Sequence, residues 1–159
     1  KNSILIEEFL TDAEVTVGII GNVDSIIVLP IIEEDYSELP KGLPKICGYE
    51  AKWFPESPYM QNLKSIRATL PLQVEQEIIS HSLKLFQRLN CRDYCRIDWR
   101  LNSMGEPKLL EVNPNPGWCW DGHLAKMSSF GGMEYSQMLE AIIKASEMRN
   151  NPIEGIHSL

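Results

Sequence analysis

The stretch that decides the predicted fold reads Tyr-Cys-Arg-Ile-Asp-Trp-Arg-Leu at residues 94–101, followed by Pro-Lys-Leu-Leu-Glu-Val-Asn at residues 107–113. Polar and apolar side chains alternate through both runs, which is the pattern of a strand with one buried face. The short segment between them contains Gly105, a residue that favours tight turns. We therefore predict an antiparallel hairpin at this point of the chain.

One face of the hairpin gathers polar side chains. The predicted members of this face are Arg96, Asp98 and Arg100 on the first strand and Leu109, Glu111 and Asn113 on the second. A turn near Gly105 can place Asp98 opposite Glu111, and facing carboxylates repel unless a cation lies between them. Oxygen ligands of this kind suit Mg²⁺ rather than zinc, and Arg96 adds a fixed positive charge. The same alternation also fits a solvated polar face on a half-exposed sheet.

The pattern on either side of the hairpin predicts further strands and helices. Strands are expected at residues 4–9, 14–21 and 25–33, with a short one at 49–53, and helices at 70–89, 123–130 and 135–148. Residues 34–48 are rich in proline and glycine, so we expect a long irregular loop that acts as a lid. Strands that come first and helices that follow predict an α+β fold, an antiparallel sheet covered by helices. Residues 150–159 are expected to form a loosely ordered tail.

The composition excludes several classes of protein. The 159 residues carry 15 lysines and arginines against 22 aspartates and glutamates, a net charge of −7, which argues against a nucleic-acid or membrane surface. The longest apolar run, residues 26–32, is too short to span a bilayer, and no secretory signal is present. The four cysteines form no C-x-x-C pair, so free thiols in a reducing cytoplasm are expected rather than a zinc site. The chain starts at Lys1 inside an apolar pattern, and we interpret it as part of a longer protein.

The hairpin motifs resemble a known family. Arg-Ile-Asp-Trp-Arg at 96–100 with Leu-Leu-Glu-Val-Asn-Pro-Asn-Pro-Gly at 109–117 is similar to the metal-binding hairpin of ATP-grasp ligases, most closely D-alanine–D-alanine ligases. Ile-Leu-Ile-Glu-Glu-Phe-Leu at 4–10 looks like the adenine-binding strand of that family, and Tyr-Glu-Ala-Lys-Trp at 49–53 looks like its phosphate-side lid. The resemblance covers nearly the whole chain and implies the C-terminal ATP-grasp subdomain, here residues 1–149.

The resemblance implies a role for each matching residue. Asp98, Glu111 and Asn113 would hold Mg²⁺, with Mn²⁺ as an alternative, against the phosphates of ATP. For the nucleotide, Glu7 would accept from the adenine amino group, the backbone at Glu8 and Leu10 would pair with the ring edge, Glu14 would hold the ribose hydroxyls, and Lys52 would reach the phosphates. Arg96 and the backbone N–H of Gly117 would stabilise an oxyanion. The implied activity joins a small-molecule carboxylate to an amine through an acyl phosphate, without nucleic acid or membrane partners and with a homodimer allowed for the full-length protein.

The segment after Gly117 departs from the family pattern. It reads Trp-Cys-Trp-Asp-Gly-His at 118–123, where D-alanine ligases carry hydroxyl residues and a leucine that hold the second substrate. Trp118 and Trp120 are either core anchors or the wall of a pocket. Two other functions stay open, namely another ATP-grasp enzyme, such as a dipeptide ligase or a biotin-carboxylase-like protein, and a non-catalytic nucleotide- or metal-binding module. The segment alone is expected to be inactive, because the first half of the family's ATP site lies outside it.

Overall fold

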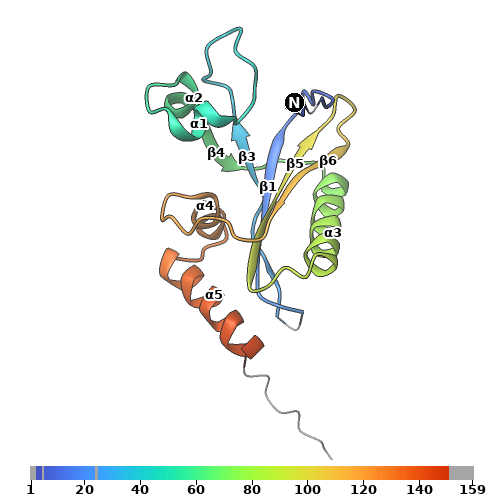
Figure 1. Ribbon diagram of the computed structural model, residues 1–159, viewed down its shortest axis with the longest axis vertical. Coiled ribbons are helices and arrows are strands. Elements are labelled where there is room, and N and C mark those ends of the chain that lie inside the picture. The colour runs from blue at the N-terminus through green and yellow to red at the C-terminus, as the bar shows by residue number, and fades with distance from the viewer. Residues whose placement is uncertain (1–2, 5, 24, 151–159) are drawn as a thin grey trace, which may run out of the picture.

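A six-stranded antiparallel sheet forms the centre of the molecule. The computed structural model describes residues 3–4, 6–23 and 25–150. The strands are β1 (Glu14–Ile20), β2 (Ile27–Val28), β3 (Ile32–Asp35), β4 (Lys64–Arg67), β5 (Tyr94–Leu101) and β6 (Pro107–Asn113). Their order across the sheet is β4-β3-β1-β5-β6, and β2 pairs with β1 beside β3 (Figure 1).

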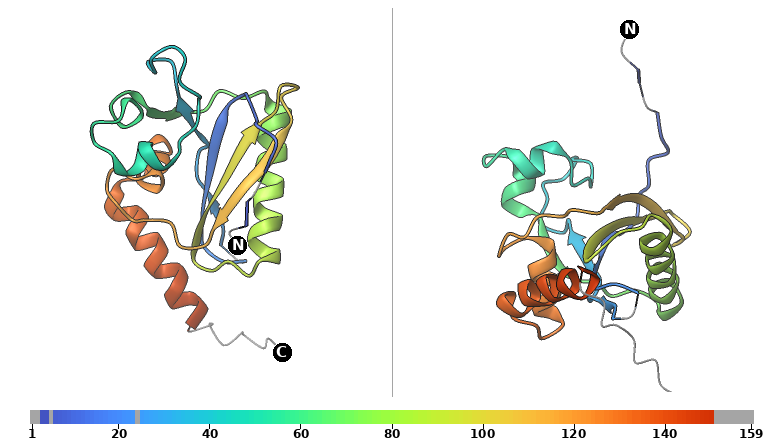
Figure 2. Two further views of the ribbon diagram at one scale, coloured as in Figure 1. Left: turned by 45° about the horizontal axis from the view of Figure 1, so that its top comes forward. Right: turned by 60° about the horizontal axis from the view of Figure 1, so that its bottom comes forward.

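Helices cover both faces of this sheet. They are α1 (Tyr49–Trp53), α2 (Pro58–Asn62), α3 (Leu72–Arg88), α4 (His123–Phe130) and α5 (Tyr135–Asn150). Figure 2 shows α3 on one side of the sheet and α4 with α5 on the other, while α1 and α2 lie beyond one end of the strands. The arrangement confirms the predicted α+β fold, an antiparallel sheet covered by helices. None of the helices in the described ranges is long and apolar enough to cross a membrane.

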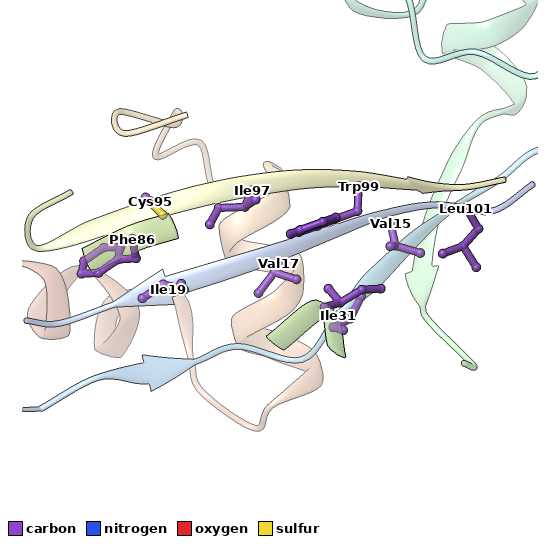
Figure 3. Close-up of a cluster of buried hydrophobic side chains, with 10 residues drawn as sticks. Val15, Val17, Ile19, Ile31, Phe86, Cys95, Ile97, Trp99 and Leu101 are labelled. Atoms are coloured by element: carbon purple, nitrogen blue, oxygen red, sulfur yellow. The ribbon is translucent and has the colours of Figure 1, made fainter. Parts of the chain in front are cut away.

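The core on the α3 side follows from strand alternation. Every second residue of β1 and β5, beginning at Val15 and Cys95, points toward α3, where Ile78 and Phe86 pack against them (Figure 3). Trp99 belongs to this core, and its indole N–H donates to Ser82 Oγ of α3 at 3.0 Å. The alternate residues of β1 and β5 must therefore face the opposite side, the side on which the polar face of the hairpin was predicted.

The elements along the second half of the chain confirm the sequence predictions closely. The hairpin strands and α4 have the predicted bounds, α3 lies within residues 70–89, and α5 extends beyond the predicted residue 148 to Asn150. The rest of the predicted tail lies outside the described residues. The predicted strand at 25–33 divides into β2 and β3 around Pro30, which lacks the N–H that a continuous ladder needs.

Two of the predicted strands were wrong. Residues 49–53 form α1, a single helical turn, because the segment has no strand to pair with and its aromatic rings contact one another instead. The described residues of 4–9 are irregular, and the side chains of Ile4 and Ile6 are 85% and 88% exposed. Only from Asp12 does the backbone join the sheet, where its N–H donates to the carbonyl of Leu101 at 3.2 Å. Alternation without a neighbouring strand did not produce a strand.

A β-bulge interrupts the hairpin, and alternation alone did not predict it. Near the turn, Trp99 pairs with Leu109, whereas the next pair is Asp98 with Glu111, so Leu110 is one extra residue on β6. Leu109 therefore pairs with Trp99 at the edge of this irregularity. Asp98 nevertheless lies across from Glu111 as predicted, and Asn113 lies two pairs farther along, opposite Arg96.

Candidate functional site

The polar side of the sheet brings residues from four neighbouring strands together. Thr16 of β1 pairs with Asp98 of β5, and Asp98 pairs with Glu111 of β6. On the other side of β1, Ile32 pairs with Thr16, so Glu34, two residues along β3, has its side chain on the same face. The predicted hairpin site is thus one end of a polar strip that runs across the sheet.

Arg96 joins the two facing carboxylates. Its Nε donates to Asp98 Oδ1 at 2.9 Å and its Nη2 donates to Asp98 Oδ2 at 2.8 Å. The same Nη2 lies 3.7 Å from Glu111 Oε1, so the two carboxylates are close neighbours around one guanidinium. Burial opposes the charge of Arg96, but the bonds to Asp98 and the charge of Glu111 outweigh it and raise the pKa of the guanidinium. The cation that relieves the predicted repulsion is therefore Arg96.

The donor set of this hairpin suits a hard divalent cation. Asp98 accepts three hydrogen bonds, two from Arg96 and one from Thr16 Oγ1 at 3.0 Å, which leaves about one acceptor position of a carboxylate open. Glu111 is exposed, and Asn113 Oδ1 accepts from the backbone N–H of Asn115 at 3.0 Å and from no other donor of the described residues. These oxygens are of the type that Mg²⁺ or Mn²⁺ prefers. The described ranges, the hairpin included, contain no group of three or more histidine, cysteine, aspartate or glutamate side chains placed to hold a metal. A metal at the hairpin would therefore need Asn113 as a ligand beside the two carboxylates.

A cavity of about 560 Å³ adjoins the hairpin and collects the residues predicted to bind the nucleotide. Its lining residues are Glu7, Glu8, Phe9, Leu10, Glu14, Ile46, Cys47, Arg100, Lys108, Leu109, Leu110 and Glu111. Four of the predicted nucleotide-binding residues thus share one cavity with a predicted metal ligand. The four come from the irregular N-terminal segment and β1, and the metal ligand comes from β6. Its wall is part apolar and part charged, which is typical of sites for small charged molecules.

A buried ion pair forms the floor of this cavity, and the sequence analysis missed its role. Arg100 Nη1 donates to Glu14 Oε2 at 2.7 Å, and the hydroxyl of Tyr36 donates to the same oxygen at 2.6 Å. Burial, followed by the contact with Glu14, raises the pKa of Tyr36 well above its usual value, so this hydroxyl stays a donor. Strand alternation placed Arg100 on the polar face, but no pattern in the sequence indicated the partner that it finds on β1.

Neither Lys52 nor Gly117 is among the residues that line the cavity. Lys52 is exposed on α1, and its charge acts on the thiol of Cys47, a cavity residue whose pKa burial raises to about 11. Gly117 follows β6 in an irregular, exposed segment. Among the described residues, no hydrogen bond links Gly117 to Arg96 or to Asp98. The roles predicted for Lys52 and Gly117 therefore stay predictions.

A second contact between titratable side chains lies on the same strip, at β3. His123 Nε2, in the first residue of α4, is 3.0 Å from Glu34 Oε1, and Glu34 is only 5% exposed. Ser65 Oγ of β4 donates to the same carboxylate at 3.1 Å. Burial alone would raise the pKa of Glu34, but His123, Ser65 and the charge of Lys126 together lower it below its usual value.

Replacement of Glu34 by glutamine is expected to lower the free energy of unfolding at neutral pH by about 1–3 kcal/mol, because the half-buried His123 and Ser65 lose a charged acceptor. Because the pKa of Glu34 is lowered in the folded state, its carboxylate stabilises the fold fully at pH values above the usual carboxyl pKa of 4.5. This stabilisation is lost as the pH falls through the lower pKa that Glu34 has in the folded protein. Urea denaturation from pH 3 to pH 7 should therefore show a weaker pH dependence in Glu34→Gln. The exposed Glu56→Gln is the matched control, and equal pH dependence in Glu34→Gln and the unsubstituted protein would contradict the expectation.

The two tryptophans after Gly117 are exposed, so neither is a core anchor. The backbone carbonyl of Trp118 accepts from the hydroxyl of Tyr135 at 2.6 Å, and the rings of Trp118 and Tyr94 pack edge to face with their centroids 5.5 Å apart. Trp120 is more exposed still. The segment is thus fixed between β5 and α5 while its aromatic rings stay open to solvent.

Comparisons with known proteins identify a family and a similar fold. Residues 1–144 match the family model described as D-ala D-ala ligase C-terminus. The chain is 30% identical over 145 residues to the D-alanine–D-alanine ligase of Haemophilus influenzae (91% of this chain, 44% of the relative). It is 28% identical to the uncharacterized protein y4sG of Sinorhizobium fredii (91% and 41%). The solved D-alanine–D-alanine ligase of Bacillus anthracis superposes with a TM-score of 0.69 at 26% identity, over 94% of this chain and 43% of that one. The chain spans less than half the length of each of these three proteins.

Proposed function

The chain belongs to the D-Ala–D-Ala ligase C-terminal family of ATP-grasp proteins, and from this premise we propose that it supplies one half of the nucleotide site of a carboxylate–amine ligase that uses ATP and Mg²⁺. The observation that carries the proposal is the shared cavity. Glu7, Glu8, Leu10 and Glu14, chosen from the motif, line the same cavity as Glu111 of the hairpin. A nucleotide with its base near the first group and its phosphates near the hairpin fits this distribution.

Each end of the cavity then has its own task. At the nucleoside end, Glu7 accepts from the amino group of adenine, the backbone of Glu8 and Leu10 pairs with the ring edge, and Glu14 accepts from ribose hydroxyls. At the phosphate end, Asp98, Glu111 and Asn113 hold Mg²⁺, which offsets phosphate charge when bound. Lys52, on the helix after the loop, adds a cation toward the phosphates.

The proposed reaction has two steps. In the first, a carboxylate oxygen of the donor substrate takes the γ-phosphoryl group of ATP, which gives an acyl phosphate and releases ADP. In the second, an amine attacks the acyl carbon, and phosphate leaves as the amide bond forms. Arg96, once it has left Asp98, and the N–H of Gly117 stabilise the negative oxygen of the tetrahedral intermediate. The protein orients the reactants and neutralises charge, so no enzyme nucleophile is required.

The natural full-length protein is expected to convert ATP to ADP over many turnovers only when Mg²⁺, a carboxylate and an amine are all present, because without the amine the acyl phosphate is not consumed. A coupled assay of ADP with a panel of amino acids and small dipeptides measures this, and mass spectrometry identifies the product. Because Trp118 and Trp120 stand where hydroxyl residues hold the second D-alanine in relatives, we expect an acceptor other than D-alanine to react fastest. Binding of MgATP without turnover on any pair would contradict the ligase assignment and favour a binding module, whereas D-alanine as the best acceptor would contradict the expectation on specificity.

A further inference from the structure

We propose that Arg100 is the positioning residue of the nucleoside end of the cavity, a proposal that rests on the proposed function of that cavity. In this role Arg100 fixes the Glu14 carboxylate for the ribose hydroxyls and ties the end of loop 36–48 to the floor of the site. It touches neither the phosphates nor the reacting atoms, so it acts through Glu14 and through the loop.

The first support is the way in which Glu14 is held. Arg100 Nη1 and the hydroxyl of Tyr36 both donate to Oε2 of Glu14, at 2.7 and 2.6 Å. Within the described chain, no donor lies on Oε1 of that carboxylate. Two donors on one oxygen fix the orientation of the group and leave the other oxygen for a hydroxyl donor from a ligand in the cavity.

The second support is the burial of the guanidinium itself. Arg100 is 5% exposed, lies 5.8 Å from the ring centroid of Phe9 and 6.0 Å from that of Tyr36, and lines the cavity. Its buried Nε has no hydrogen-bond partner among the described residues. Burying a charge with one donor unsatisfied is an inefficient way to stabilise a sheet, because an apolar side chain of similar volume often serves as well. The arrangement is better explained by what it does for the ligand site.

The third support is the contact with the loop. Arg100 Nη2 donates to the backbone carbonyl of Lys45, and Tyr59 of α2 donates to the neighbouring Pro44 carbonyl at 2.8 Å. Lys52 follows seven residues later on α1. One guanidinium therefore connects the carboxylate proposed to bind the ribose with the segment that leads to the proposed phosphate-side lysine.

The test compares ATP with 2′-deoxy-ATP and 3′-deoxy-ATP in the natural full-length protein. Since a hydrogen bond to a charged group contributes about 10- to 100-fold in binding, unsubstituted protein should prefer ATP over at least one analogue by about tenfold in kcat/KM. In Arg100→Met this preference should fall below about threefold, and KM for ATP should rise about tenfold with kcat changed less than about threefold. The exposed Arg88→Met on α3 is the matched control and should keep the unsubstituted values.

A second variant keeps the test decisive if Arg100→Met does not fold. Arg100→Lys retains the charge but cannot hold Glu14 and the Lys45 carbonyl with one planar group, so its preference for ATP should drop at least threefold. Unchanged preference in a folded Arg100 variant, or no preference in unsubstituted protein that consumes ATP, would overturn the positioning role. Unsubstituted protein that neither binds nor consumes ATP would instead overturn the proposed function of the cavity.

Discussion

Asp98→Asn is expected to reduce ligase turnover of the natural full-length protein by about 1,000-fold or more, the largest effect of any single change considered. The substitution removes the carboxylate charge that faces Glu111 across the hairpin, and metal-held charge compensation contributes several kcal/mol to phosphoryl transfer. Glu111→Gln should act in the same direction. ADP release at saturating MgATP measures the loss, and circular dichroism checks that the fold remains.

Glu106→Gln provides the control for this experiment, because it removes a carboxylate from the same hairpin. Glu106 is exposed and binds Lys108 and Asn102 near the turn, away from the paired carboxylates. Its turnover should stay within about twofold of the unsubstituted protein. If Asp98→Asn kept even a tenth of the turnover, the hairpin would not be the metal site of a ligase.

Arg96→Lys is expected to lower turnover by about 100- to 1,000-fold, the usual cost of losing a donor to a developing oxyanion. The fold should also weaken by about 1–3 kcal/mol, because Asp98 loses a two-point hydrogen-bonded partner that an ammonium group cannot replace. Steady-state assays measure the first effect, and urea denaturation without Mg²⁺ measures the second.

The exposed Arg92→Lys, just before β5, is the matched substitution and should change neither quantity. A loss of stability with full turnover would assign Arg96 a structural role only. Full stability with low turnover would show that its bonds to Asp98 matter little to the metal-free fold.

The sequence predicted those parts of the fold in which a residue's neighbours are set by local periodicity. The hairpin, α3, α4 and α5 have long regular patterns, and their bounds were correct or nearly so. Alternation failed at Ile4 and Ile6, because a strand also needs a neighbour with which to pair. It failed again at residues 49–53, where five residues are too few to distinguish a helical turn from a strand.

The candidate site shows the same division between local and distant information. Alternation placed Asp98, Glu111 and Asn113 on one face, and the resemblance selected the residues that share the cavity with Glu111. The ion pair of Arg100 with Glu14 joins residues 86 positions apart, and the contact of His123 with Glu34 likewise joins segments that are far apart in the sequence. Such contacts depend on how the chain folds over the sheet, and no local pattern encodes them.

The bulge at Leu110 lets the register of the paired carboxylates differ from the register set by the turn, whereas a regular hairpin has one register throughout. From the turn as far as Trp99 and Leu109 the register is set by the tight connection, and a plain ladder would continue by pairing Asp98 with Leu110 and Ile97 with Glu111. Glu111 would then point into the apolar core. The extra residue lets the turn keep its own geometry while Glu111 stays opposite Asp98. Both Leu109 and Leu110 also line the cavity. A connection one residue longer or shorter would thus keep the acidic pair aligned only with a compensating change in the bulge.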